Sequence, residues 1–146
     1  MRGFRGYVSS RVFCKQRVPQ HVQNLVIRDY CARRGITYLL SATEYAMPNC
    51  YMMLEQTMND LENLDGIVCY SLFQFPTDRI TRLRLFEQIL EKERELHFAA
   101  ESLSICETSH IKRISKWGII KLILIPSIRY YIFSLKCYCW HSWSNN

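Results

Sequence analysis

This sequence of 146 residues predicts an α/β protein built on a three-layer, open parallel sheet. Short runs of β-branched, aromatic and other apolar residues alternate with longer stretches in which apolar residues recur at helical spacing. The loops between these segments are short. Strands that alternate with helices in this way form parallel sheets with right-handed crossovers. The alternation predicts the strand order 2-1-3-4, with a switch point between the first and third strands.

The first half of the chain supplies two predicted strands and the helix between them. Phe4–Arg11 is an apolar run that ends in two hydroxyls and an arginine, as expected where a central strand reaches the carboxyl edge of a sheet. A helix is predicted from Val18 to Arg34, because Pro19 suits the first turn and Gly35 suits a position just past the end. The segment that follows, Ile36–Leu40, is almost continuously apolar, which is typical of a strand covered on both faces.

The second half repeats the pattern. Asn49 can cap a helix whose apolar stripe runs to Leu61. The remaining predicted elements are a third strand over Ile67–Leu72, a helix from Thr77 or Asp78 to Leu90, a fourth strand over Leu96–Glu101, and a closing helix over Ile111–Leu122 that stops before Pro126.

Length, composition and charge predict one α/β domain over residues 1–105, followed by the closing helix and a basic, aromatic C-terminal tail over residues 106–146. The net charge of +6 is uneven: residues 1–34 carry eight Lys/Arg against Asp29, and residues 35–66 carry five acids and no Lys/Arg. Basic ends permit a phosphate-bearing partner or an anionic membrane surface. An ordinary solvated surface explains them equally well.

The cysteines and the tail indicate a cytoplasmic protein. Seven is an odd number of cysteines, no secretory signal pattern opens the chain, and Cys31 and Cys69 lie in apolar runs, so reduced thiols are expected. The cluster Cys137-Tyr-Cys139-Trp-His141 lacks a fourth ligand, and no metal site is predicted. Trp117–Leu135 is interrupted by charged residues and proline, so it is expected to fold over the core or to dimerise rather than to span a membrane.

Several enzyme classes are excluded by missing motifs. The sequence has no Gly-x-Gly-x-x-Gly, no phosphate loop with Gly-Lys-Ser/Thr and no Gly-x-Ser-x-Gly elbow. A dinucleotide, ATP or any other cofactor is therefore not expected. His21 and His97 are isolated in the sequence, and a structural role is expected for both.

Polar side chains gather at the predicted carboxyl edge, where open α/β sheets bind ligands. Ser10 and Ser9 are candidate nucleophiles, and Glu44 is a candidate catalytic residue at the end of the second strand. Guanidinium groups and helix N-termini bind phosphate oxygens. The candidate ligand-binding residues are therefore Arg11, Arg17, Gln20, Tyr45, Ser71 and Gln74. Serine and arginine at a strand end also serve simply to cap loops, and this alternative stays open.

Three segments resemble the N-terminal catalytic domain of serine recombinases, the resolvase and invertase fold: Gly6-Tyr-Val-Ser-Ser10, Gln20/Gln23-Asn-Leu25 and Leu61–Leu72. The resemblance spans residues 4–101 and implies a resolvase-like or flavodoxin-like sheet. The Arg-Val-Ser unit of that family is replaced here by Ser9-Ser10-Arg11, and its Asp-Arg-x-x-Arg motif by Leu72–Arg79. What the resemblance implies is a relative of the recombinases without an intact catalytic motif.

A second resemblance, over residues 3–101, is to a small family of proteins found sporadically in bacterial carbohydrate biosynthesis clusters. It is carried by Gly6-Tyr-Val-Ser-Ser-Arg11, Arg17-Val-Pro-Gln-His-Val-Gln-Asn-Leu-Val-Ile-Arg-Asp-Tyr30, Leu40-Ser-Ala-Thr-Glu-Tyr-Ala-Met-Pro48, Cys50-Tyr-Met-Met-Leu-Glu-Gln56, Asp65-Gly-Ile-Val68 and Tyr70-Ser-Leu-Phe-Gln74. This resemblance implies a role in the production of lipopolysaccharide or another surface polysaccharide, without supplying a reaction.

Two functions follow from the sequence. In the first, the chain is an accessory protein or an enzyme of surface-polysaccharide biosynthesis that binds a phosphorylated or nucleotide-linked sugar at the carboxyl edge, and nucleic acid is not expected as a partner. In the second, it is a DNA-binding relative of the serine recombinases. A homodimer and a peripheral membrane contact through the C-terminal tail are further partners that the sequence allows. Whether the chain is an enzyme stays open.

Overall fold

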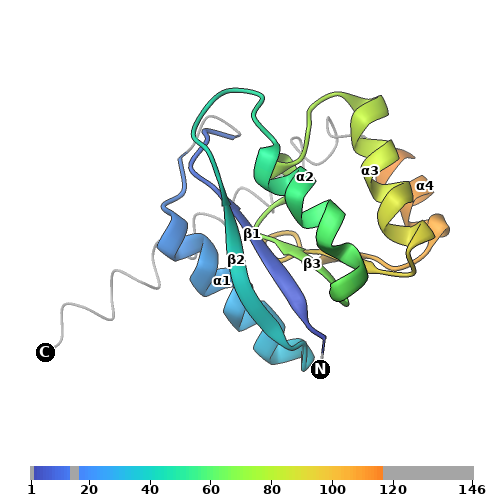
Figure 1. Ribbon diagram of the computed structural model, residues 1–146, viewed down its shortest axis with the longest axis horizontal. Coiled ribbons are helices and arrows are strands. Elements are labelled where there is room, and N and C mark those ends of the chain that lie inside the picture. Colours follow the sequence, from blue (N-terminus) through green and yellow to red (C-terminus); the bar gives the residue numbers. More distant parts are fainter. Residues whose placement is uncertain (1, 14–16, 117–146) are drawn as a thin grey trace, which may run out of the picture. The chain divides into compact units, whose positions relative to one another are not determined.

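The computed structural model describes residues 2–13 and 17–116 and contains a five-stranded sheet of order β2-β1-β3-β4-β5 (Figure 1). The first four strands are parallel, and β1 lies between β2 and β3 and pairs with both. This confirms the predicted fold class and the order 2-1-3-4. The strands are β1 (Phe4–Ser9), β2 (Tyr38–Glu44), β3 (Gly66–Cys69), β4 (Glu95–Phe98) and β5 (Leu103–Ile105).

The antiparallel strand β5 was not predicted from the sequence. The segment Leu96–Glu101, expected to be one strand, is β4 only as far as Phe98. The backbone then reverses: the N–H of Ser102 donates to the carbonyl of Ala99, and Ser102 has a φ of 51°. The chain returns as β5, in which Leu103 pairs with Phe98. An apolar run shows the presence of a strand but carries little information about such a reversal within it.

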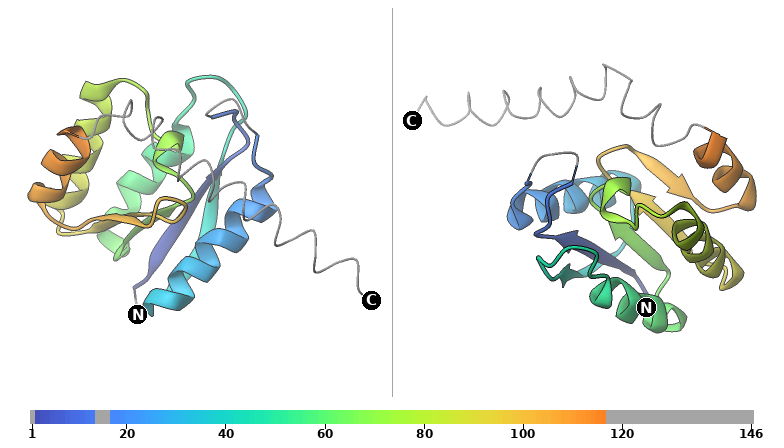
Figure 2. Two further views of the ribbon diagram at one scale, coloured as in Figure 1. Left: turned by 180° about the vertical axis from the view of Figure 1, so that it is seen from behind. Right: turned by 90° about the horizontal axis from the view of Figure 1, so that it is seen from above.

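The helices cover both faces of the sheet, as the three-layer prediction requires. Figure 2 shows α1 on one face and α2 and α3 on the other. Gly35 ends α1 in the left-handed conformation, with a φ of 66°, directly after two arginines. The helical segments are α1 (Gln20–Arg34), α2 (Met52–Asn59), the 3₁₀ helices η1 (Asp60–Asn63) and η2 (Leu72–Gln74), α3 (Arg79–Glu91) and α4 (Thr108–Lys116).

Each face of the sheet has its own packed core. On the α1 face, Val8 and Val68 pack with Ile27 of the helix. On the opposite face, Phe86 of α3 lies with its ring centroid 5.5 Å from that of Phe75 and 6.2 Å from that of Phe98. All four residues of β3 are buried, as expected for a parallel strand covered from both sides.

The chain divides into two units, Met1–Ile111 and Lys112–Asn146. The C-terminal half of the predicted closing helix, the apolar stretch Trp117–Leu135 and the cluster from Cys137 to His141 lie outside the described residues. Within the described residues, the structure contains no helix with the length and apolar character needed to cross a membrane. Four cysteines of that part are free thiols: Cys31, Cys50, Cys69 and Cys106.

Candidate functional site

The carboxyl edge of the sheet brings the predicted site residues to one side of the molecule. Ser9 at the end of β1 pairs in register with Glu44 at the end of β2. Tyr7 pairs with Cys69, the last residue of β3, and Ser71 follows two residues later. Parallel pairing therefore places Ser9, Glu44 and Ser71 at the same edge, which is where this class of sheet leaves a crevice.

Ser9 is buried and its hydroxyl is used inside the protein. Its Oγ accepts hydrogen bonds from the backbone N–H of Arg11 at 3.1 Å and from Nε of the same residue at 3.2 Å. Its own backbone N–H donates to Oε1 of Gln23 at 3.0 Å. Ser9 therefore holds the turn after β1 in place, and its hydroxyl is not accessible to solvent.

Arg11 ties together the loops that follow three strands. One terminal nitrogen, Nη1, donates to the carbonyl of Cys50 at 2.7 Å, and the other, Nη2, donates to the carbonyl of Gln74 at 3.1 Å and to the hydroxyl of Tyr7 at 3.2 Å. The guanidinium also lies 4.2 Å from the ring centroid of Tyr51. These contacts point its donors inward, so the predicted ligand-binding residue acts as a clamp on the edge.

Glu44 is buried and fixes the start of α2. Its Oε2 accepts the N–H groups of Met53 at 3.1 Å and Leu54 at 3.2 Å, and the Tyr7 hydroxyl at 3.1 Å. Burial and the nearby carboxylate raise the pKa of Tyr7, which therefore remains a hydrogen-bond donor. The carboxylate satisfies N–H groups that a helix start leaves without partners. Its predicted catalytic role is not required to explain its position.

Ser10, Arg17 and Gln20 form the outer corner of the edge. Nε2 of Gln20 donates to the hydroxyl of Ser10, which is half-buried. Nε of Arg17, an exposed side chain, donates to the carbonyl of Ser10 at 3.1 Å. The first turn of α1 contains no acid, and no side chain of the described residues caps it. The corner thus combines a hydroxyl, an amide, a guanidinium and the positive end of a helix.

Gln23 is a site residue that the sequence alone does not single out. Its buried side chain accepts from Nε2 of Gln74 at 2.7 Å, in addition to the Ser9 N–H, and it donates to the carbonyls of Ser9 and Val18, both at 2.7 Å. The available signal was its position: Gln23 lies one helical turn before Ile27, on the inward stripe of α1. An amide on an apolar stripe indicates a buried polar partner.

Ser71 and Gln74 extend the network of Gln23 toward the end of β4, where Glu101 is a further acceptor. Oγ of Ser71 donates to Oε1 of Glu101 at 2.6 Å, and the N–H of Leu72 donates to Oε2 at 3.1 Å. Oε1 of Gln74 accepts the N–H of Ser71 at 3.1 Å. By contrast, Tyr45 is 54% exposed and takes part through its backbone N–H, which donates to Glu44. Ser71, Gln74 and Tyr45 therefore do not join the outer corner around Ser10.

The buried Glu101 carboxyl predicts a pH dependence of stability. Burial raises its pKa above the usual 4.5, so the folded protein holds this proton more tightly than the unfolded chain. The contribution of Glu101 to the free energy of unfolding is therefore greatest below pH 4.5 and decreases as the pH rises through the raised pKa. Urea unfolding at a series of pH values should show this decrease in the parent and a flatter profile in Glu101→Gln. Parallel profiles for the two proteins would contradict the assignment.

The sheet order and its edge define a resolvase-like α/β fold, and solved structures agree. The chain matches the N-terminal catalytic domain of TP901-1 integrase with a TM-score of 0.62 and 14% identity, covering 80% of this chain and 93% of that one. It matches a resolvase family site-specific recombinase from Streptococcus pneumoniae with a TM-score of 0.60 and 10% identity, covering 91% of this chain and 99% of that one. These likenesses establish the fold of the chain.

No protein-family model matches the sequence, and no curated protein matches it. The resemblance to the serine recombinase fold is thus confirmed at the level of structure. The resemblance to the carbohydrate-cluster family finds no support in these comparisons.

Proposed function

We propose that this protein binds a phosphate-bearing ligand at the outer corner of the sheet edge, and that the ligand is the backbone of a nucleic acid. The observation that carries the proposal is the grouping of Ser10, Arg17 and Gln20 at the start of α1. These side chains can donate to phosphate oxygens, and the helix start adds N–H groups and the positive end of its dipole.

The contacts of Ser10 favour binding over covalent chemistry. A nucleophilic serine needs a neighbouring base to take its proton. Among residues 2–13 and 17–116, the hydrogen-bond partner of the Ser10 hydroxyl is the Gln20 amide nitrogen, which donates a hydrogen bond and cannot serve as that base. Glu44, the carboxylate predicted to assist, is buried against the start of α2. The proposed function is therefore ligand binding without strand exchange.

The fold and the charge support nucleic acid as the ligand. Two solved structures that share the fold are an integrase catalytic domain and a site-specific recombinase. Residues 1–34, which include this corner, carry eight Lys/Arg against one acid, and such a surface attracts a polyanion. This revises the expectation of a sugar phosphate. A sugar phosphate presents the same phosphate oxygens and is tested beside DNA.

The test is the salt dependence of DNA binding. The full-length protein is titrated into a fluorescein-labelled DNA duplex, and Kd is measured by anisotropy at increasing NaCl concentrations. Affinity should fall steeply with salt, because each neutralised phosphate releases counterions. Arg17→Ala should weaken binding and reduce the slope of log Kd against log salt by about 1, as expected for the loss of one phosphate contact.

Arg33→Ala is the matched control, since it removes the same charge from the other end of α1, about 20 Å away by helix geometry. Arg33 pairs with Asp29 at 2.7 Å and should leave the slope nearly unchanged. An equal effect of both variants would show that net charge alone attracts DNA. Calorimetry with glucose 1-phosphate and UDP-glucose covers the other ligand class: if these bind through Arg17 and DNA does not, the nucleic-acid function is wrong. If neither class binds, the corner is a structural cap.

A further inference from the structure

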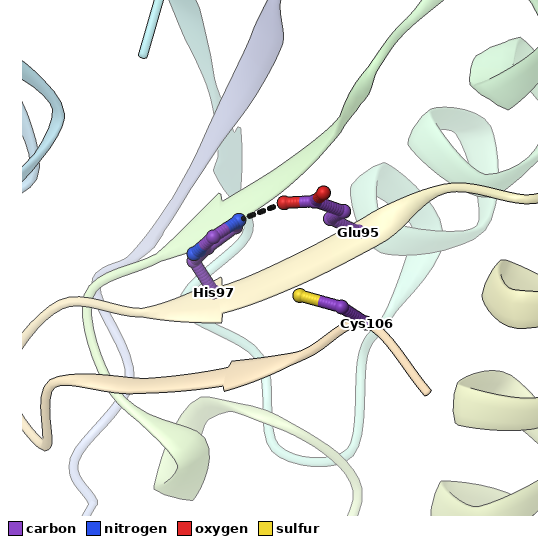
Figure 3. Close-up of side chains that lie close together, drawn as sticks. All are labelled: Glu95, His97 and Cys106. Carbon is purple, nitrogen blue, oxygen red and sulfur yellow. Dashed lines mark hydrogen bonds and ion pairs between the residues drawn. The ribbon is translucent and has the colours of Figure 1, made fainter. Parts of the chain in front are cut away.

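The hairpin of β4 and β5 gathers three side chains whose atoms can bind a metal ion. Glu95 and His97 are two residues apart on β4 and therefore project from the same face of the strand. Leu96 pairs with Ile105, so Cys106 lies opposite Glu95 in the antiparallel register. The ligand atoms of the three residues all lie within 4.8 Å of one another, and Oε2 of Glu95 is 2.9 Å from Nε2 of His97 (Figure 3).

We propose that Glu95, His97 and Cys106 bind one Zn²⁺ ion, with water in the fourth position. The donor set of one carboxylate oxygen, one imidazole nitrogen and one thiolate sulfur suits zinc, whose three-ligand sites keep an open position. Bond lengths in such sites place neighbouring ligand atoms about 3.3–3.7 Å apart. Oε2 of Glu95 and Nε2 of His97, which are 2.9 Å apart, would separate slightly to reach that spacing, and any ligand atoms that lie nearer to the 4.8 Å limit would move closer together. The Glu95 side chain is 48% exposed and Cys106 is exposed, so both can move.

His97 is held in an orientation that suits a metal ligand. Its ring is buried, and the ring centroid lies 5.2 Å from that of Phe4. Nδ1 lies 3.0 Å from the hydroxyl of Tyr30 on α1, while Nε2 points to the cluster. In the metal-bound form, the imidazole proton stands on Nδ1 and is donated to the Tyr30 hydroxyl, which leaves the lone pair of Nε2 for zinc. The Cys106 thiol loses its proton to solvent as the sulfur–zinc bond forms.

Glu95 and Cys106 line a cleft of about 270 Å³, which gives the ion a path from solvent and leaves room for a bound water. Glu93 and Glu107 line the same cleft and make it attractive to a cation. Arg94 also lines the cleft, but two of its three guanidinium nitrogens point to backbone carbonyls: Nε donates to Leu61 and Nη1 to Glu93. The site is therefore accessible, and its neighbourhood carries more acidic than basic groups.

Cobalt provides the direct test, because Co²⁺ replaces Zn²⁺ and is visible in the absorption spectrum. Reduced full-length protein is titrated with CoCl₂ without oxygen. The expected result is one equivalent of Co²⁺ bound, a thiolate-to-cobalt charge-transfer band, the strong visible bands of four-coordinate cobalt, and loss of all of them when Zn²⁺ is added. Zinc affinity is then measured by competition with a chromophoric chelator. Absence of the charge-transfer band would overturn the proposal.

Variants distinguish metal binding at this site from metal binding by other cysteines and histidines of the chain. Cys106→Ser should abolish the charge-transfer band, and Glu95→Gln should weaken zinc binding at least tenfold; both positions are exposed, and circular dichroism checks the fold. Tyr30→Phe should weaken binding about tenfold through His97. His21→Gln, at an exposed position on α1 outside the cluster, is the histidine control and should leave zinc binding unchanged, and the double variant Cys137→Ser/Cys139→Ser controls for the tail. If the band persists in Cys106→Ser or disappears in the tail variant, the metal lies elsewhere and the proposal is wrong.

Discussion

Replacing Glu44 by glutamine is expected to lower the free energy of unfolding by about 3 kcal/mol, because buried donors lose their acceptor. The carboxylate accepts two N–H groups at the start of α2 and the Tyr7 hydroxyl. An amide has one acceptor oxygen, and its NH₂ group would face some of these donors. Urea unfolding followed by circular dichroism measures the effect.

Glu55→Gln is the matched control for this prediction. Glu55 lies in the first turn of the same helix and is exposed, so removing its charge should cost less than about 0.5 kcal/mol. The comparison separates the buried acceptor from a simple interaction with the helix dipole. A Glu44→Gln variant as stable as the parent would show that these hydrogen bonds do not contribute to stability. That result would favour the predicted catalytic function of Glu44.

Arg11→Ala is expected to destabilise the protein by about 3 kcal/mol, since it leaves the carbonyls of Cys50 and Gln74 and the Tyr7 hydroxyl without their donor. Arg11→Lys should recover less than half of this loss, because one ammonium group cannot reproduce the planar fork of the guanidinium. Thermal and urea unfolding of the three proteins under identical conditions provide the measurement.

Arg17→Ala is the contrasting variant. Arg17 is exposed, and its side chain makes one hydrogen bond within the described part of the chain, to the carbonyl of Ser10, so its loss should change stability by less than about 0.5 kcal/mol. The two variants should therefore have different effects: loss of Arg11 should lower stability, and loss of Arg17 should weaken phosphate binding. If Arg11→Ala is as stable as the parent, the clamp contributes nothing. The side chain would then be available to a ligand, as the sequence predicts.

These expectations describe an edge with two zones. The inner zone consists of buried acceptors and donors that satisfy one another, including Ser9, Glu44 and Gln23. Such fully satisfied networks make the position of loops rigid. The outer zone, around Ser10 and Arg17, is where a ligand can meet side chains that still face solvent. A rigid inner zone would keep the geometry of the outer zone fixed for the ligand that we propose.

The sequence by itself determined the strand order and the edge at which polar residues collect. Apolar periodicity, the polar ends of the strands and the stop at Gly35 are local signals, and parallel pairing with right-handed crossovers converts them into a topology. The same signals could not separate Ser9 from Ser10. Adjacent residues at a strand end point to opposite sides, and the partners that decide which hydroxyl is buried come from distant parts of the chain.

Only the tertiary structure decided what the polar residues do. Arg11 is a clamp because the loops after β2 and β3 bring carbonyl groups to it, and Glu44 is a helix cap because α2 starts within reach. The reversal at Ser102 created β5 and placed Cys106 beside Glu95 and His97. A sequence records which groups can donate, accept or bind a metal, whereas the choice among these roles depends on partners that long-range packing supplies.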